Sequence, residues 1–321
     1  MRALKTALAL CTLGVLTACT FNIAAPETSA SGAGSQGSGS HGSGSAGSGS
    51  AGAEDSAPLP TDGTNPSTSP DDPPVSGEQF DIEGKDAAAV GERRIYQNSS
   101  KFRDLETSGM LEPGARYRTW HEDGSGSGSW GSCSFGWFVG TNTQIYNLTA
   151  GHCGEVGDAV YVHTSGRDPV YVGEFVHSDF DDAKISSGPD YGLIQIESRY
   201  FDNVVTNPRV SMSDEPVEIR GYADASWLSA NQPYMCRLGF RNGLSCGSYE
   251  EITNEYTVTF ANITDHGDSG GVIWAFDPND SSQKNIYAVA ANSYTNEYDA
   301  TTVGGKLIEP VMTDFDLTIF N

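Results

Sequence analysis

From Gly131 to the end of the chain, short apolar runs alternate with turn-forming residues. Short runs rich in β-branched and aromatic side chains are typical of strands. They lie at residues 135–139, 144–148, 159–162, 170–176, 191–196, 217–222, 234–238, 256–261, 272–275 and 287–291. Because no long helical pattern separates them, the sequence predicts an all-β body built as closed barrels or sandwiches, two of them. The tail at 309–320 predicts a helical turn packed on this body.

The region before this body has a different composition. Residues 29–53 are almost wholly Gly, Ser and Ala, and residues 54–78 are rich in Pro, Asp, Ser and Thr. Such sequences bury too little apolar surface to fold, so we expect a disordered tether over residues 20–78. Its Gly/Ser part has an expected reach of roughly 30 Å.

Residues 79–114 are harder to assign because their apolar content is low. The stretch 86–95 is compatible with the start of a short helix. A propeptide and a further length of linker both stay open at this point. A Gly/Ser run at 124–129 predicts one more loop directly before the folded body.

The first 19 residues have the layout of an export signal. Arg2 and Lys5 precede an apolar run at 7–16, which is too short to cross a membrane. The ending Leu-Thr-Ala-Cys resembles a bacterial lipoprotein signal, in which Cys19 would be acylated and become the new N-terminus. The alternative is an ordinary secretory signal cut near Ala18 or Ala25.

The composition excludes some classes of function. The 321 residues carry a formal net charge of −24, and no basic stripe offsets it, which argues against binding to nucleic acid. This acidity favours solubility outside the cell, and a preference for basic protein substrates stays open. No metal-binding or organic-cofactor motif stands out, so we expect neither a metal nor a cofactor. We expect a monomer.

Candidate chemistry begins with the stretch Gly267-Asp268-Ser269-Gly270-Gly271, which lies between two predicted strands. Glycines on a sharp loop let neighbouring N–H groups turn toward one point. If the Ser269 hydroxyl attacked a carbonyl, the N–H groups of Gly267 and Ser269 would stabilise the oxyanion there. Such a serine needs a base and an acid that orients the base.

Two further stretches offer these groups. His152 follows an apolar strand within Leu-Thr-Ala-Gly-His-Cys, and Asp190 stands at the start of another strand within Asp-Tyr-Gly-Leu-Ile. Taken singly, each is weak, because a lone histidine is more often structural and an aspartate at a strand end is usually a turn residue.

Together, the three motifs in the order His, Asp, Ser resemble the chymotrypsin-fold serine peptidases of the trypsin-like family. The closest resemblance is to the bacterial branch that contains the streptogrisins and α-lytic protease. The order is informative because unrelated hydrolases arrange the same groups differently. The resemblance covers roughly residues 115–321 and implies two packed six-stranded antiparallel β-barrels, at about 130–200 and 212–321, with a short C-terminal helix.

The resemblance also implies an activity, that of a serine endopeptidase hydrolysing peptide bonds of proteins or peptides through an acyl-enzyme. Ser269 would be the nucleophile, His152 the general base and then acid, and Asp190 the residue that orients His152. An imidazole suits the proton transfer because its pKa lies near neutrality. Ser293 matches the family position whose hydroxyl supports the carboxylate.

The cysteines agree with this resemblance. Four remain after Cys11 and Cys19 are set aside, an even number that is usual outside the cytoplasm. As in the family, we expect two disulfides, which are Cys133–Cys153 and Cys236–Cys246.

Arg237 follows the first cysteine of the second pair, where the bacterial branch carries an arginine that replaces a newly cut N-terminal amine. The resemblance implies an ion pair with Asp268. The alternative is a solvated arginine of little energetic weight.

One departure from the family concerns the specificity pocket. The stretch 260–266 lacks the cysteine that bacterial relatives usually carry before the serine motif. Ile263 lies near the expected pocket floor, which argues against an acidic base, whereas Asp265 leaves a basic preference open. Substrate specificity is therefore not readable from the sequence.

Two other functions remain to be weighed against a peptidase. A catalytically inactive protease-fold module could serve binding or adhesion on the cell envelope, but such relatives generally lose a member of the triad, and all three are present. An esterase with the same triad is the third possibility. In each case the leader predicts a location outside the cytoplasm, either as an envelope lipoprotein or as a secreted protein.

Overall fold

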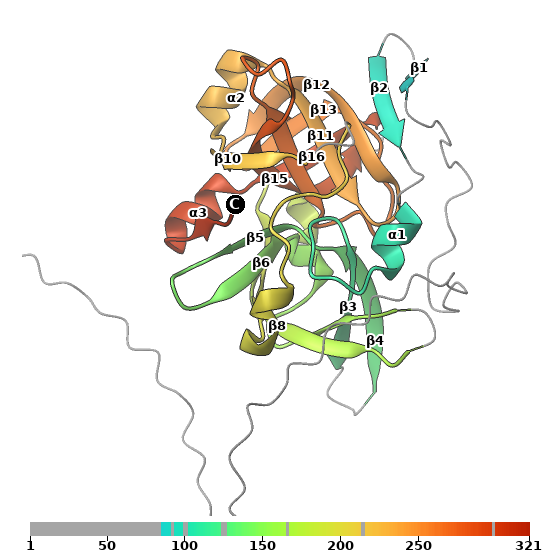
Figure 1. The fold of residues 1–321 in the computed structure, drawn as a ribbon, viewed down its shortest axis with the longest axis vertical. Helices are drawn as coiled ribbons and strands as arrows, with labels where there is room; N and C mark the ends of the chain where they lie inside the picture. Colours follow the sequence, from blue (N-terminus) through green and yellow to red (C-terminus); the bar gives the residue numbers. More distant parts are fainter. Residues whose placement is uncertain are drawn as a thin grey trace, which may run out of the picture. The chain divides into compact units, whose positions relative to one another are not determined.

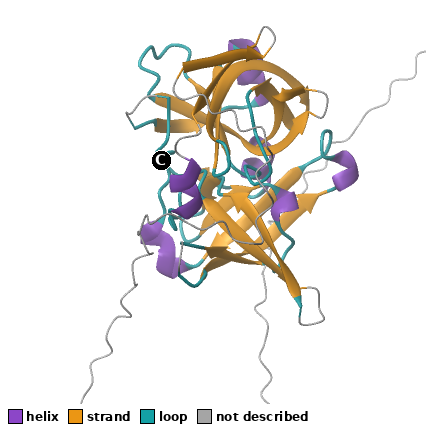
Figure 2. Ribbon diagram, turned by 90° about the vertical axis from the view of Figure 1, so that its right-hand side faces the viewer, coloured by secondary structure: helices purple, strands orange, loops and turns teal. Residues whose placement is uncertain are grey.

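The computed structural model describes residues 85–90, 93–98, 102–122, 127–164, 167–212, 216–296 and 299–321. The predicted leader with Cys19 and the tether at 20–78 lie outside the described residues. The described strands form two sheets, one above the other in Figures 1 and 2. None of the described helices is long and apolar enough to cross a membrane.

The first sheet is built from the N-terminal half of the body, with β17 added from the C-terminal end of the chain. Its eight strands follow the order β17-β5-β6-β9-β8-β7-β3-β4. They are β3 (Arg116–Glu122), β4 (Gly128–Ser134), β5 (Trp137–Gly140), β6 (Ile145–Thr149), β7 (Ala159–Val162), β8 (Val170–Phe180), β9 (Asp190–Ile196) and β17 (Thr318–Ile319). The sheet wraps a core that includes Tyr117, Phe135, Phe138 and Phe175.

The second sheet has nine strands, six of which close into a barrel in the order β12-β11-β14-β15-β16-β13, with β13 pairing back to β12. Ile273, Phe260 and Leu307 are among the residues that fill it. Three strands lie outside the ring: β10 pairs with β15, and β2 and β1 extend the sheet from β12. The strands are β1 (Lys85–Val90), β2 (Arg93–Asn98), β10 (Glu218–Tyr222), β11 (Tyr234–Gly239), β12 (Gly243–Asn254), β13 (Thr257–Ala261), β14 (Val272–Phe276), β15 (Asn285–Asn296) and β16 (Asp299–Leu307).

The two sheets pack through a shared apolar cluster. Trp137 and Leu193 of the first sheet meet Leu238 and Trp274 of the second in it. The indole Nε1 of Trp137 also donates to the carbonyl of Ala290 at 3.0 Å. The remaining elements are short: α1 (Phe102–Thr107), η1 (Gly151–Cys153), η2 (Asp182–Lys184), η3 (Ser198–Asn203), α2 (Ala225–Asn231) and α3 (Glu309–Asp314).

The all-β, chymotrypsin-like fold class and the short C-terminal helix are confirmed, the helix being α3. Of the two predicted six-stranded antiparallel barrels, the second is present, whereas the first sheet has eight described strands and no pairing among them that closes it. Each of the ten predicted strands overlaps a strand of the structure. The sequence missed β1, β2, β3, β4, β12, β16 and β17, as well as helices α1 and α2. The helix start considered for 86–95 is wrong, because the described residues of this stretch belong to strands β1 and β2.

Strand β4 begins inside the predicted Gly/Ser loop, at Gly128. A glycine is needed at this position of the strand, because a Cβ at Gly128 would lie 2.5 Å from the Trp120 ring on the neighbouring strand. Only a glycine fits beneath that indole.

The segment 79–114, undecided from the sequence, is packed on the body over much of its described length. Leu105 of α1 is buried in the cluster between the sheets, and Leu111 is buried in the first core. Glu112 holds Arg209 through two hydrogen bonds, one of them 2.8 Å long between Nη2 and Oε1. The bidentate geometry ties this segment to the loop after η3.

Candidate active site

Helix η1 fixes the position of His152 at the end of β6. Gly151 is required by close contact, because a Cβ there would lie 2.9 Å from the carbonyl oxygens of Asp179 and Tyr191. On the other side, a disulfide joins Cys153 to Cys133 in β4. The imidazole is therefore held by backbone packing and by a covalent link.

Asp190 is the first residue of β9 and is fully buried. Its Oδ2 lies 2.8 Å from Nδ1 of His152, and its Oδ1 accepts from the His152 backbone N–H at 2.9 Å. Ser293 Oγ donates to the same Oδ2 at 2.6 Å. Because the carboxylate accepts from Nδ1–H, the neutral ring carries its lone pair on Nε2.

Two opposing effects set the charge of Asp190. Burial alone would raise the pKa of its carboxyl, but the hydrogen bond and charge of His152, together with the bond from Ser293, more than offset that effect. The pKa is thus held below its ordinary value. The carboxylate stays ionised at neutral pH and favours an imidazolium next to it.

Ser269 lies on the loop between β13 and β14. Gly267 and Gly270 on this loop have φ angles of 98° and 79°, which favour glycine. A Cβ at Gly270 would lie 1.9 Å from Thr149 Oγ1, so the loop can approach β6 only with glycine there.

Ser134 ties the serine loop to the first sheet, a role that its neighbours in the sequence do not indicate. Its Oγ donates to the carbonyl of Gly267 at 2.8 Å and accepts from the N–H of Phe240 at 3.0 Å. Its own N–H donates to the carbonyl of Ser269 at 2.9 Å. These bonds hold the carbonyls of Gly267 and Ser269 on strand β4.

Within the described part of the chain, the N–H groups of Gly267 and Ser269 donate no hydrogen bond. Ser269 Oγ and His152 Nε2 likewise make no hydrogen bond to a described residue, including to each other. Both side chains line a cavity of about 550 Å³ together with Thr264 and Tyr294. They also line a second cavity of about 460 Å³ on the Cys133 side. A catalytic alcohol and its base often form their hydrogen bond only in the complex with substrate.

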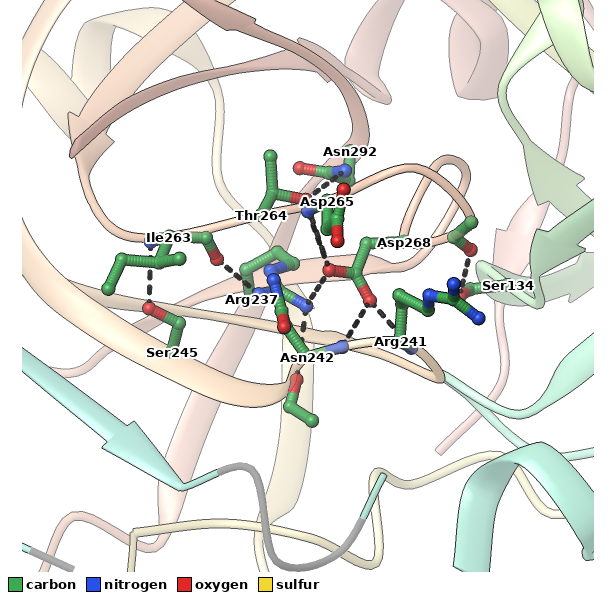
Figure 3. Close-up of polar contacts among 12 residues, drawn as sticks. Ser134, Arg237, Arg241, Asn242, Ser245, Ile263, Thr264, Asp265, Asp268 and Asn292 are labelled. Carbon is green, nitrogen blue, oxygen red and sulfur yellow. Dashed lines mark hydrogen bonds and ion pairs between the residues drawn. The ribbon is translucent and has the colours of Figure 1, made fainter. Parts of the chain in front are cut away.

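Arg237 and Asp268 form an ion pair whose side chains are fully buried, with Nη1 3.1 Å from Oδ2 (Figure 3). Arg237 also donates to the carbonyls of Gly243 and Ile263. The Cys236–Cys246 disulfide links two directly opposed residues of β11 and β12 beside it. The residue before Ser269 is therefore anchored in the barrel.

Backbone groups complete the environment of Asp268. Its Oδ1 accepts from the N–H groups of Arg241 and Asn242 at 2.9 and 3.0 Å, and its Oδ2 accepts from the N–H of Asp265 at 3.0 Å (Figure 3). Burial raises the pKa of the Asp268 carboxyl, while the Arg237 guanidinium and these N–H groups act in the opposite direction. Because neither side chain reaches water, the charged form of Asp268 is stabilised by Arg237, and the charged form of Arg237 is stabilised by Asp268.

The residues considered for the specificity pocket divide into two groups. Ile263 is buried, with its N–H bound to Ser245 Oγ at 2.9 Å, whereas Asp265 lines the larger cavity. The buried Asn292 also lines that cavity and donates from Nδ2 to Thr264 Oγ1 at 3.0 Å.

A buried lysine near the site was not foreseen from the sequence. Lys306 Nζ donates to Thr257 Oγ1 at 3.0 Å and lies 5.4 Å from the centre of the Tyr294 ring. Burial lowers its pKa to about 8, and the Asp190 carboxylate acts in the opposite direction. Lys306 thus places a cation on β16, the strand paired with β15, which carries Ser293 and Tyr294.

Metal binding has one geometric candidate in the part of the chain that the structure describes. Potential ligand atoms of Cys133, His152 and Cys153 lie within 4.8 Å of one another. Both sulfurs are joined in a disulfide, however, and a metal requires thiolates. The cluster therefore has only His152 to offer a metal.

No protein-family model and no curated protein matches this chain. Among solved structures, Protease A of Thermobifida fusca is 22% identical with a TM-score of 0.45, covering 66% of this chain and 98% of its own. The chymotrypsin of Cellulomonas bogoriensis is 21% identical with a TM-score of 0.44, covering 65% and 98%. A Nocardiopsis protease is 20% identical with a TM-score of 0.44, covering 66% and 99%. In its fold, this chain resembles bacterial serine proteases of the chymotrypsin type.

Proposed function

We propose that the chain is a serine endopeptidase that cleaves proteins or peptides through an acyl-enzyme. One observation carries the proposal. His152, held by the buried Asp190 carboxylate, lines the same two cavities as Ser269, whose loop has two N–H groups without a hydrogen-bond acceptor among the described residues. Each of these groups has a task in acyl transfer, and their combination is costly to maintain for structure alone.

In the first half of the reaction, Ser269 Oγ forms a bond to the carbonyl carbon of the substrate while His152 Nε2 takes the hydroxyl proton. The carbonyl oxygen becomes an oxyanion and accepts hydrogen bonds from the N–H groups of Gly267 and Ser269. Asp190 stabilises the imidazolium without taking its proton. The intermediate then expels the amine, which receives the proton from Nε2, and an ester at Ser269 remains.

In the second half, a water replaces the amine. His152 Nε2 takes a proton from the water as its oxygen attacks the ester carbonyl, and the same two N–H groups bind the new oxyanion. Collapse of this intermediate returns the proton from Nε2 to Ser269 Oγ and releases the acid product. The substrate and one water, together with the chain's own groups, balance the two halves.

A fluorophosphonate probe tests the proposed nucleophile. Its phosphorus forms a bond to an activated serine oxygen and loses fluoride, so we expect covalent labelling of Ser269 in the purified protein. Labelling is to be followed by mass spectrometry of the modified peptide, and peptide cleavage by release of a fluorophore from a peptide library.

The controls separate the competing functions. Ser269→Ala should lose the label, whereas Ser198→Ala, at an exposed position in η3, should keep it. Absence of label on the unmodified protein, under conditions that label a control protease, would favour a binding module. Label without peptide cleavage, but with ester hydrolysis, would favour an esterase.

We further propose that the enzyme acts outside the cytoplasm on a lipid anchor at Cys19. The basis is the leader sequence, with the small residue Ala18 before the cysteine. Acylation would add apolar surface that holds the protein at a membrane, and the tether would hold the catalytic body away from it.

Replacing Cys19 by alanine is expected to move the protein from the membrane fraction to the soluble fraction of the producing cell. The matched control is Cys11→Ala, which changes a cysteine inside the same leader. Fractionation with immunodetection measures the shift, and metabolic labelling with a fatty acid checks its cause. Equal membrane partitioning of both variants contradicts the anchor but leaves the peptidase proposal intact.

A further inference from the structure

Strand β2 covers an edge of the C-terminal barrel that other strands leave open. The first part of β12 pairs with β11 on one side, and only its later part pairs with β13 on the other. Strand β2 fills the remaining edge, with Tyr96 opposite Cys246, Gln97 opposite Ser245 and Asn98 opposite Leu244 (Figure 1). An uncovered edge would present unpaired backbone groups.

The side chain of Ile95 packs against the start of the segment that carries Ser269. Ile95 is fully buried and forms a cluster with Ala261 and Ile263. The Ile263 carbonyl accepts a hydrogen bond from Arg237, and the Ile263 N–H donates one to Ser245 Oγ. The apolar contact from β2 therefore fixes a residue that supports the buried ion pair.

A hydrogen bond from the same strand reaches the second support of Asp268. Gln97 is buried, and its Nε2 donates to the carbonyl of Asn242 at 2.6 Å. The N–H of Asn242 in turn holds Asp268 Oδ1 at 3.0 Å. Both sides of Asn242 are thus fixed, one by Gln97 and one by Asp268.

The turn that carries Asn242 makes this support consequential. Residues 240–242 connect β11 to β12, and Gly243 follows with a φ of 61°. A three-residue hairpin turn closed by such a glycine has its N–H groups set by the turn geometry. Without the bond from Gln97, the backbone of this turn would be held less firmly, and so would the N–H groups of Arg241 and Asn242 that bind Asp268. Gly267 and Ser269 flank Asp268 in the chain, so their N–H groups depend on the same support.

We infer that β2 is a permanent part of the working enzyme and that Gln97 is a positioning residue for the loop that carries Ser269. This inference rests on the proposed function. It places the start of the catalytic unit at or before Arg93, upstream of the boundary near residue 115 that the sequence resemblance suggested. Any proteolytic cleavage of the N-terminal region would then fall before β2, within the tether, and the mature enzyme would retain β2.

The N-terminus of the active enzyme tests the first part. The full chain is to be produced in its export host, captured with a biotinylated fluorophosphonate, and its N-terminus read by mass spectrometry. We expect captured species that begin at or before Arg93. Captured, fully active species that begin after Asn98 would overturn the inference, although the peptidase proposal would stand.

Gln97→Ala tests the second part in the full chain. Loss of one buried hydrogen bond is expected to lower kcat about tenfold, with KM changed less than about twofold. Hydrogen exchange at the amides of Arg241 and Asn242 should become faster, a readout that does not depend on catalysis. The matched control is Gln195→Ala, at an exposed position of β9.

The outcomes keep the two proposals apart. If Gln97→Ala matches the Gln195→Ala control in both kcat and amide exchange, Gln97 has no positioning role, and the peptidase proposal is unaffected. If the variant does not fold, N-terminal mapping of the unmodified enzyme still decides whether β2 is retained. If no species is captured at all, the proposed function fails, and amide exchange alone decides the role of Gln97.

Discussion

Changing Asp190 to asparagine is expected to lower kcat by about four orders of magnitude and to leave the fold intact. An asparagine keeps the size of the side chain but loses its charge. An amide N–H facing the ring would favour the tautomer with its proton on Nε2, which cannot accept from Ser269. Because the pKa of Asp190 is held below its ordinary value, the wild-type carboxylate is charged at every pH above mildly acid, so the loss should persist throughout that range.

Steady-state cleavage of a peptide substrate across pH 5 to 10 measures this effect, with Asp202→Asn as the exposed matched control. Near-ultraviolet circular dichroism checks that the variant is folded. A variant that retains a tenth or more of the wild-type kcat would show that the Asp190–His152 contact does not serve catalysis.

Replacing Arg237 by methionine is expected to destabilise the fold by about 3–5 kcal/mol and to abolish fluorophosphonate labelling. Methionine fills similar space but leaves Asp268 buried without its countercharge. For a body of this size, the loss corresponds to a fall in Tm of about 10 °C. Thermal unfolding and labelling, compared with the exposed Arg199→Met variant, measure both effects.

A double variant separates charge from packing. Adding Asp268→Asn to Arg237→Met removes the uncompensated carboxylate while keeping an oxygen for the Arg241 and Asn242 N–H groups. It should regain a large part of the lost stability but not the labelling, because the serine loop has lost its anchor. A single Arg237→Met variant as stable and as reactive as the control would mean that the ion pair supports neither the fold nor the loop.

The strands that the sequence predicted share one property: an apolar run long enough to be seen locally. Strand β12 escaped notice because its outer part, after Gly247, reads Ser-Tyr-Glu-Glu-Ile-Thr-Asn and alternates between partial burial and exposure. Four of the nine residues of β16 are Thr or Gly, and β2 has a single strongly apolar residue, Ile95. These strands form because they pair with neighbouring strands of the sheet, and those neighbours come from other parts of the chain.

The site divides in the same way. His152, Asp190 and Ser269 each stand in a short motif, and the three motifs in their chain order can be recognised from the sequence together, although His152 and Asp190 are weak signals singly. Ser134 and Gln97 act through partners 133 and 145 residues away, and nothing in their immediate sequence announces that. The Ser134 contact forms only when the two sheets assemble, and the Gln97 contact forms only when β2 pairs with β12 within the second sheet.

The Cys133–Cys153 bond has a consequence for the cell that makes this protein. It spans 20 residues and clips the backbone next to His152 onto the strand that leads to Ser134. In the reducing cytosol these sulfurs remain thiols, so the nascent chain lacks about 3 kcal/mol of cross-link stabilisation just where the two halves of the site must align. If the chain is exported as proposed, this bond forms only after export, and the proposed proteolytic activity then matures outside the cytosol of the producing cell.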